Sequence, residues 1–264
     1  MNVNNQDTIK SPSVSMILES TFQNIDTFSE NSAKSLSEYY SHFLQEGKGW
    51  LDQNEEVYKE IYTFLSGSHE RPPTLLDVGC GVGTESICFS LMGAKTIGVE
   101  PSISRLNTCI ERMKLAQEES NLDLKFTSEE FFTLKGMYDI IWLNNTFHHI
   151  EPREKFSEKI NSILKPGGII IFAETNSLNP LLQLQFLKWR GFKTIIEMEL
   201  ECGKVIPFGN ERITRGGKIC KLFEKFSYTK ESLRYFQYLP NKRVFHSANR
   251  SLRKKKFPRF LCCR

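Results

Sequence analysis

The sequence predicts an α/β fold: a Rossmann-like, doubly wound, mainly parallel seven-stranded sheet with helices on both faces. Two observations support this prediction. Between residues 74 and 176, short apolar runs alternate with longer segments of helical periodicity, which is the succession expected of a parallel sheet. The first run leads directly into Gly79, Gly81 and Gly83, and glycines suit a tight turn that a ligand approaches closely. A helical N-terminal cap and an insertion after the fifth strand complete the predicted architecture.

Changes in composition and periodicity divide the chain into five regions. The first is polar and weakly patterned apart from a short apolar group near Met16, so we expect a flexible arm with a short helix there. Gly67 and Pro72-Pro73 end the next, helical region and precede the first strand. The predicted regions are the flexible arm (1–28), the helical N-terminal cap (29–70), the cofactor-binding core (71–176), an insertion or substrate lid (177–228), and a last segment (229–264) with the last helix and C-terminal strands or a basic tail.

Within the core, each parallel crossover should be right-handed. Ligands of such folds bind beyond the carboxyl ends of the strands, so side chains at those ends are the candidates for function. The predicted strands are 74–79, 95–100, 123–127, 138–144 and 168–174, and the predicted helices are 29–46, 54–66, 84–92, 103–119, 152–164, 180–190 and 229–238.

Composition places the chain among soluble globular proteins, with 39% hydrophobic and 25% charged residues. No apolar stretch is long enough to cross a bilayer, and the start lacks the pattern of a secretory signal, so we expect a cytoplasmic protein. The seven cysteines form no Cys-x-x-Cys pair and no His/Cys group with zinc spacing, so no metal is expected. Residues 242–264 are strongly basic and contain no acid, whereas the whole chain has a net charge of only +4. The body of the protein is therefore mildly acidic.

The glycine loop is the most specific chemical signal in the sequence. A dinucleotide fingerprint reads Gly-x-Gly-x-x-Gly, and Thr84 stands where its third glycine would be, which disfavours a dehydrogenase. Glu100 ends the second predicted strand, 21 residues after Gly79. A doubly wound fold places there the acid that accepts hydrogen bonds from ribose hydroxyls. Glu100 on its own would be interpreted as a solvated acid, but its distance from the loop favours the ribose role.

Two further motifs follow in order. Residues 138–150 read as Tyr-Asp, an apolar strand and then His148-His149, and residues 164–168 read Leu-Lys-Pro-Gly-Gly before the fifth strand. Together with the Gly-x-Gly-x-Gly loop and Glu100, these motifs resemble those of class I S-adenosylmethionine-dependent methyltransferases of the small-molecule type. The resemblance covers about residues 74–176.

This resemblance implies S-adenosylmethionine as the cofactor. It places the glycines beneath the methionine part of the cofactor with Asp77 at the same end, Glu100 on the ribose, and the Asn144 carbonyl near the sulfonium or the amino group. The third strand departs from the family, which usually has a Gly-Asp-Ala-type step there, so adenine contact falls to the Ser128 hydroxyl or the Glu129 backbone. The predicted cofactor-binding residues are Asp77, Gly79, Cys80, Gly81, Gly83, Glu100, Pro101, Ser128, Glu129 and Asn144.

His149 and His148 are the predicted catalytic residues. A histidine titrates near neutral pH and can take a proton from a hydroxyl nucleophile. His149 is preferred because it lies nearer the end of its loop, while packing or orientation of that loop is the plain alternative for either ring. The polar run from Glu174 to Asn179 either faces the substrate or caps a helix that begins at Pro180.

The predicted function is methyl transfer to a small-molecule acceptor, such as a sugar or a lipid-linked precursor, with oxygen preferred over nitrogen or carbon. The alternative is a non-catalytic S-adenosylmethionine-binding or scaffold protein. Nucleic acid is not an expected substrate, because the Asn/Asp-Pro-Pro-aromatic motif of amino-methylating enzymes is absent after Asn144. The basic tail 242–264 suits peripheral contact with an anionic membrane, at about 1 kcal/mol per cation. A solvated tail or a last pair of strands is the simpler interpretation of that segment.

Overall fold

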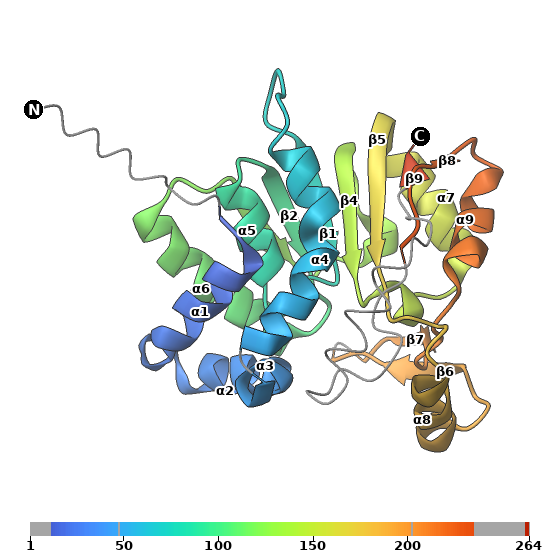
Figure 1. Cartoon of the computed structure of the whole chain (residues 1–264), viewed down its shortest axis with the longest axis horizontal. Coiled ribbons are helices and arrows are strands. Elements are labelled where there is room, and N and C mark those ends of the chain that lie inside the picture. The colour runs from blue at the N-terminus through green and yellow to red at the C-terminus, as the bar shows by residue number, and fades with distance from the viewer. Residues whose placement is uncertain (1–11, 47, 202, 235–261, 264) are drawn as a thin grey trace, which may run out of the picture.

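The computed structural model describes residues 12–46, 48–201, 203–234 and 262–263, and it shows a central sheet flanked by helices (Figure 1). The strands of the central sheet are β1 (Thr74–Val78), β2 (Lys95–Val99), β3 (Leu124–Thr127), β4 (Tyr138–Asn144), β5 (Leu164–Ala173), β8 (Thr229–Lys230) and β9 (Cys262–Cys263). The helices are α1 (Val14–Gln23), α2 (Glu30–Tyr39), α3 (Ser41–Glu46), α4 (Lys48–Leu65), α5 (Thr84–Leu91), α6 (Ile103–Glu119), α7 (Arg153–Ile163), α8 (Pro180–Arg190) and α9 (Gly216–Glu224). Short 3-10 turns are η1 (Ile25–Thr27), η2 (Phe131–Thr133) and η3 (Phe147–His149).

The strand order is β3-β2-β1-β4-β5-β9-β8. The first five strands are all parallel to their neighbours, and the short β9 pairs antiparallel with both β5 and β8. The chain runs outward from β1 to β3 on one side and from β4 to β5 on the other. The segments that follow β1 and β4 therefore meet at the switch point of the sheet, where doubly wound folds bind their ligands.

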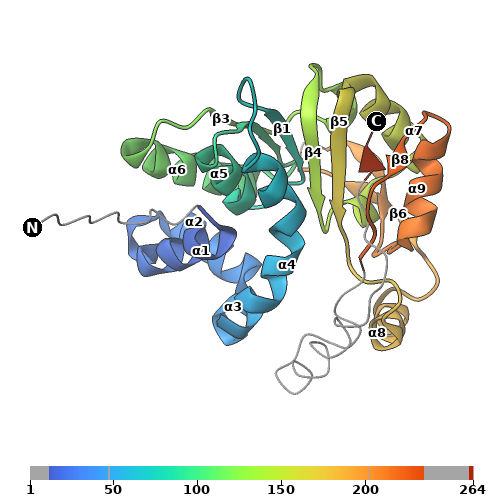
Figure 2. The ribbon, with the colours of Figure 1, turned by 45° about the horizontal axis from the view of Figure 1, so that its top comes forward.

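Both faces of the sheet are buried, as the sequence predicts for parallel strands. On one face Leu75, Ile140 and Trp142 pack with α1, α4 and α5, and on the other Leu76 and Ile141 pack with α7 and α9. Figure 2 shows these two helical layers on opposite sides of the strands. Successive residues of a strand point to opposite faces, which explains why neighbours in sequence belong to different cores.

The N-terminal helix corrects one prediction. The Ser13 hydroxyl accepts a hydrogen bond from the backbone N–H of Met16 and begins α1, and Val14 and Leu18 are buried against the sheet helices. Thr21, one turn further along, is buried as well. The short helix predicted near Met16 is therefore confirmed as α1, but it packs against the core and does not belong to a flexible arm. Residues 1–11 of the predicted arm lie outside the described residues.

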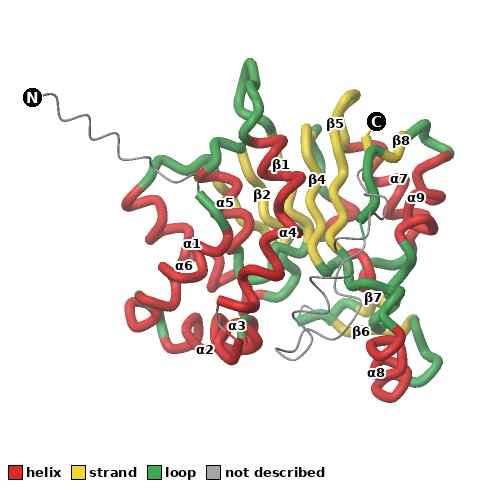
Figure 3. The backbone as a smooth tube through the Cα atoms, in the orientation of Figure 1, coloured by secondary structure: helices red, strands yellow, loops and turns green. Residues whose placement is uncertain are grey.

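The insertion after β5 consists of α8 and a two-stranded hairpin, β6 (Ile195–Glu199) and β7 (Val205–Gly209). Figures 1 and 3 show these elements at one end of the sheet, beyond the end of β5. The Asn179 side chain accepts a hydrogen bond from the Leu182 N–H and caps α8, which starts at Pro180 as predicted. The hairpin reaches back to the core through a bridge between Ile150 and Phe208.

The segment after the insertion differs from the sequence prediction. Helix α9 covers 216–224, where no helix was predicted, and Ile219 and Phe223 anchor it to the sheet. The helix predicted for residues 229–238 is wrong for residues 229–234, because Thr229 and Lys230 form strand β8 and no helix follows up to residue 234. Residues 235–238 of that prediction lie outside the described residues. The basic tail lies outside the described residues apart from the backbone of strand β9. Among the described residues, no helix combines the length and the apolar character needed to cross a membrane.

Candidate active site

The glycine loop joins β1 to α5 and has a backbone that only glycine adopts readily. Gly79, Gly81 and Gly83 have φ angles of +71°, +58° and +82°. A Cβ added to Gly79 would lie 2.5 Å from Thr146 Cγ2, and one added to Gly81 would lie 2.3 Å from the Tyr39 hydroxyl. The loop is therefore confined by residues from the β4 side and from α2. This cradle of three glycines lets neighbouring groups approach the backbone before α5 more closely than a Cβ would permit.

Two carboxylates bracket this cradle. Glu100, directly after β2, is 4% exposed and accepts hydrogen bonds from the N–H groups of Gly81 (3.0 Å) and Ser102 (3.1 Å). Burial raises the pKa of Glu100, although these bonds and the nearby Arg105 act in the opposite direction. Asp77 on β1 is 1% exposed and accepts a 2.6 Å hydrogen bond from Ser86 of α5. Asp77 thus braces the start of α5 beneath the loop.

Glu85 is a site residue that the sequence analysis missed. Its carboxylate accepts hydrogen bonds from Tyr58 (2.7 Å), Trp142 (2.7 Å) and the amide of Asn144 (2.5 Å). Burial raises the pKa of Glu85, and the three donors oppose that effect. Asn144 ends β4, so Glu85 fixes the side chain of the residue predicted to approach the cofactor. The sequence signal was weak, because an acid in the first turn of a helix is common for other reasons.

The remaining predicted cofactor residues lie around the same edge. Cys80 is buried, and Pro101 is exposed directly after Glu100. Ser128 and Glu129 are exposed at the carboxyl end of β3, the outer strand on that side. The Glu129 N–H donates to Thr127 Oγ1, which shapes the turn after the strand. The structure therefore places Ser128 and Glu129 near the predicted adenine end, with their side chains open to solvent.

The two histidines lie after β4, in the turn η3, and have different environments. His148 is 4% exposed, and its Nδ1 lies 2.6 Å from a carboxylate oxygen of Glu174. Burial would lower the pKa of His148, but Glu174 and then Glu211 raise it above the usual value. His149 stacks on Phe208, and its Nδ1 lies 2.9 Å from the Gly209 carbonyl. Burial, together with the nearby His148, lowers the pKa of His149.

Glu174, which follows β5, organises the turn that carries the histidines. Its other oxygen accepts hydrogen bonds from the N–H groups of Thr146 (3.0 Å) and Phe147 (2.7 Å). The hydroxyl of Thr146 in turn lies 3.4 Å from the Gly79 carbonyl. The glycine loop and the histidine turn are therefore neighbours, although the sequence separates them by more than sixty residues.

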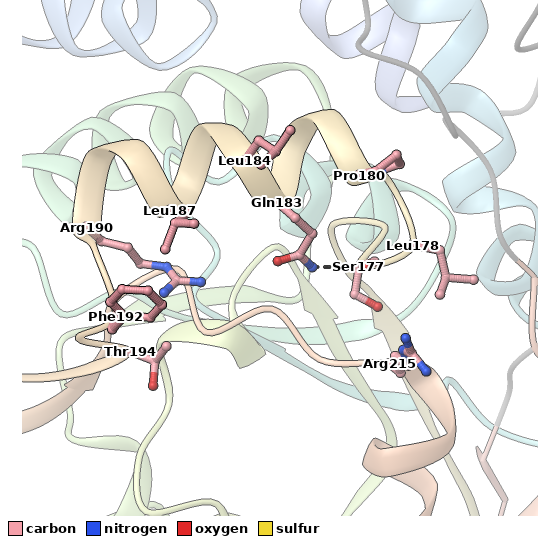
Figure 4. Close-up of a pocket in the computed structure, with 10 residues that line it drawn as sticks. All are labelled: Ser177, Leu178, Pro180, Gln183, Leu184, Leu187, Arg190, Phe192, Thr194 and Arg215. Carbon is pink, nitrogen blue, oxygen red and sulfur yellow. Dashed lines mark hydrogen bonds between the residues drawn. The ribbon is translucent and has the colours of Figure 1, made fainter.

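A pocket of about 640 Å³ opens in the insertion, between α8 and the chain that leads to β6 and α9 (Figure 4). Gln183 points down from α8 and donates to the Ser177 carbonyl, while Arg190 reaches toward the same space. The pocket is mainly apolar with two arginines at its wall. Its lining residues are Ser177, Leu178, Pro180, Gln183, Leu184, Leu187, Arg190, Phe192, Thr194 and Arg215.

Comparison with known proteins agrees with this geometry. Residues 50–229 match the methyltransferase domain family, so the chain belongs to that family. The match confirms the class predicted from the sequence, the class I S-adenosylmethionine-dependent methyltransferases. S-adenosylmethionine is the methyl donor of this class, as predicted.

Curated relatives match over a part of the chain only. This chain is 30% identical over 102 residues to a ubiquinone biosynthesis O-methyltransferase of Nitrobacter winogradskyi, and 33% identical over 104 residues to a protein of the same name from Rhodopseudomonas palustris (strain BisB18). Each match covers 39% of this chain, and 38% and 39% of the two relatives. The chain thus matches about two fifths of the length of these proteins.

Solved structures share the fold along nearly the whole chain. A magnesium protoporphyrin IX methyltransferase from Synechocystis PCC 6803, solved with bound SAH, covers 96% of this chain and all of its own, with a TM-score of 0.53 and 16% identity. A structure described as a DhpI-SAM-HEP complex covers 90% of this chain and 99% of its own, with a TM-score of 0.50 and 16% identity. At this identity the likeness establishes the fold.

Proposed function

We propose that this protein transfers the methyl group of S-adenosylmethionine to a hydroxyl group of a small amphipathic molecule. The observation that carries the proposal is the cradle of three positive-φ glycines beside the buried carboxylate of Glu100 at the switch point of the sheet. The oxygen acceptor is further supported by the O-methyltransferase names of the curated relatives.

The residues of the cradle fit the cofactor. S-adenosylmethionine, when bound, supplies the electrophilic methyl group itself, so the protein has to bind, orient and exclude water. Gly79, Gly81 and Gly83 allow the close backbone approach that the methionine part would need once the exposed Tyr39 ring moves aside, and Glu100 offers a carboxylate to two ribose hydroxyls. Asp77 and Glu85 hold α5 and Asn144 in place around that position.

His149 is the proposed proton acceptor for the acceptor hydroxyl. The Gly209 carbonyl can only accept a hydrogen bond, so Nδ1 of His149 carries the proton and Nε2 keeps its lone pair. The lowered pKa of His149 favours this neutral form. His148 is held between two carboxylates, Glu174 and Glu211, and its raised pKa favours the protonated form. We therefore assign His148 a positioning role.

The pocket beneath α8 supports an amphipathic acceptor. Its leucine and proline side chains suit an apolar tail, and Arg190 and Arg215 suit an anionic or polar substituent. We assign it to the acceptor because Ser177 in its wall lies three residues beyond Glu174, which binds the histidine turn. The proposed acceptor is consequently a hydroxylated molecule with an apolar portion, in line with a lipid-linked precursor.

Calorimetry followed by a transfer assay tests this function. The purified protein should bind S-adenosylhomocysteine, and a Gly81→Arg variant should not, because the new side chain fills the cradle. Cell extract incubated with the protein and methyl-labelled S-adenosylmethionine should then yield label in the lipid fraction. Equal binding by the Gly81→Arg variant, or no binding by the parent protein, contradicts the proposal. Binding without transfer to either the lipid or the soluble fraction would favour the non-catalytic alternative.

A further inference from the structure

We propose that His148, His149 and Glu211 bind a divalent transition-metal ion on the acceptor side of the site. Zinc is the ion that these ligands suit best. One potential ligand atom from each of these residues lies within 4.8 Å of the others. The role of the ion in methyl transfer rests on the proposed function, whereas the site itself is inferred from the distances between the ligand atoms. The sequence analysis expected no metal, because Glu211 lies 62 residues after His149 and no spacing rule connects them.

The composition of the cluster is that of a catalytic zinc site. Two imidazoles and one carboxylate leave a fourth position open for a substrate or water. Neighbouring ligands of a tetrahedral zinc lie about 3.3 Å apart, given zinc–ligand distances near 2.0–2.1 Å. Nε2 of His148 and the nearer oxygen of Glu211 are already 3.7 Å apart. This pair therefore has to close by about 0.4 Å, and no pair of ligand atoms has to close by more than about 1.5 Å, for the cluster to enclose the ion.

Both histidines are prepared for coordination through Nε2. The Nδ1 atom of His148 forms a hydrogen bond with the Glu174 carboxylate, and the Nδ1 atom of His149 forms one with the Gly209 carbonyl. Metal-binding histidines almost always donate their other ring N–H to a carboxylate or a backbone carbonyl, which fixes the tautomer and the orientation of the ring. Here both kinds of partner are present before any ion binds.

The insertion is positioned to deliver Glu211. A Cβ on Gly209 would lie 2.0 Å from the His148 carbonyl oxygen, so only glycine lets β7 approach the histidine turn this closely. Two residues later, Glu211 adopts a φ of +49°, in the left-handed region that residues other than glycine seldom adopt. Strain of this kind concentrates at functional sites, and here it accompanies a carboxylate that faces a buried histidine.

Charge balance also favours a cation. Glu174 and Glu211 both face the nearly buried His148. The nearest guanidinium, that of Arg153, is engaged by the Glu151 carboxylate and by the Arg212 carbonyl. A divalent cation bound by the three ligands would balance the charges of Glu174 and Glu211. His148 would then bind the ion in its neutral form.

The ion would act on the acceptor hydroxyl. A divalent cation lowers the pKa of an oxygen that contacts it, so the O–H bond breaks more readily and the proton passes to water. The freed oxygen lone pair then forms the bond to the methyl group, while the sulfur of the donor keeps the electron pair of the broken S–C bond. The Nε2 lone pair of His149 cannot bind the ion and take the proton at once. The metal-free protein would rely on His149 as the base, and the metal-bound protein on the cation.

Calorimetric titration of the EDTA-treated, desalted protein with Zn²⁺, and absorbance titration with Co²⁺, test the site. We expect one ion per chain and visible d–d absorption of the tetrahedral Co²⁺ form. The Glu211→Gln variant should bind at least tenfold more weakly, and Glu174→Gln, which removes the carboxylate behind His148, should weaken binding 10–100-fold. His69→Gln serves as the matched control, because His69 is exposed and precedes β1, and the hydrogen bond described for its ring is to the Phe64 carbonyl. It should bind like the parent protein.

Equal Zn²⁺ affinity in the parent and Glu211→Gln proteins, or no binding by the parent, would overturn the proposal. S-adenosylhomocysteine binding is measured on the same samples, and it also reports whether each variant is folded. If the parent protein binds S-adenosylhomocysteine but no Zn²⁺, the metal site alone is rejected. Ion binding without S-adenosylhomocysteine binding rejects the proposed function and leaves the metal site standing.

Discussion

Replacing Gly81 by alanine should damage both the stability of the fold and the binding of S-adenosylhomocysteine. At φ +58° an alanine costs about 1–2 kcal/mol in backbone strain. Its Cβ would also lie 2.3 Å from the Tyr39 hydroxyl, so that ring must move away. Tyr39 is 44% exposed and can swing outward, but it then loses the Arg105 guanidinium 5.5 Å above its ring, worth about 0.5–1 kcal/mol. The total is about 2–3 kcal/mol.

Thermal unfolding and calorimetry measure the two effects separately. At about 2–4 °C per kcal/mol for a chain of this size, Gly81→Ala should lower the melting temperature by about 4–12 °C. Its affinity for S-adenosylhomocysteine should fall at least tenfold, which corresponds to about 1.4 kcal/mol. Two glycines provide matched controls. Gly93 has a φ of +95° with nothing within 4 Å of an added Cβ, and Gly217 in α9 has neither a positive φ nor a close neighbour.

The controls distinguish strain from contact. Gly93→Ala should lose only the strain of about 1–2 kcal/mol and keep full S-adenosylhomocysteine affinity. Gly217→Ala should gain about 0.5–1 kcal/mol, because alanine favours a helix over glycine. If Gly81→Ala binds S-adenosylhomocysteine as tightly as the parent, or is no less stable than Gly93→Ala, then the loop does not form the cradle described above.

Three further outcomes are expected. Glu100→Gln should weaken S-adenosylhomocysteine binding about 10–100-fold by calorimetry, since hydrogen bonds to a charged group contribute about 1.5–3 kcal/mol each; unchanged affinity would remove Glu100 from the site. Asp139→Asn should destabilise the fold at pH 7 by about 1–3 kcal/mol. Arg71, Thr74 and Lys165 hold the pKa of Asp139 below its usual value against the effect of burial, so the stability that its charge provides is present above about pH 4 and is lost as pH falls toward the folded-state pKa. Urea unfolding of both proteins between pH 7 and pH 3 should therefore show the difference shrink in acid, and a constant difference would contradict this assignment. Arg112→Met should cost about 2–4 kcal/mol in thermal unfolding because it strips hydrogen bonds from buried acceptors; a loss under 1 kcal/mol would refute that role.

The sequence was most informative at positions whose backbone conformation or burial can be satisfied by only a few residue types. The three glycines between β1 and α5 predicted a tight turn, and each has a positive φ there. The apolar runs of β1, β2 and β4 predicted parallel strands, because strands buried on both faces have no polar side to show. Periodicity within a single element was sufficient in these cases.

The parts that could not be predicted depend on contacts between distant segments. Val14 and Leu18 look like isolated apolar residues until α5 supplies their partner surface. Glu85 resembles any acid in a first helical turn, and only the fold brings Tyr58 and Trp142 to its carboxylate. Glu211 approaches His148 through a hairpin whose placement no local pattern encodes. Strand β8 was mistaken for a helix because two residues carry too little pattern to identify their partner.

One side chain couples the N-terminal helices to the cofactor loop. Arg112, 3% exposed on α6, donates hydrogen bonds to the Val82 carbonyl (2.6 Å), the Thr84 hydroxyl (2.6 Å) and the Thr21 hydroxyl on α1 (2.8 Å). Detachment of α1 would therefore remove one support from the turn that precedes α5.

Amide hydrogen exchange should register this connection. A ligand that binds only the closed loop suppresses local opening by RT ln(1 + [L]/Kd), about 2.7 kcal/mol at a hundredfold excess over Kd. The amides of Leu18 and Thr21 would then exchange about a hundredfold more slowly in the saturated protein, although neither residue belongs to the glycine loop. The N-terminal segment thus serves as a remote reporter of occupancy, and its local unfolding equilibrium is part of the free energy of binding.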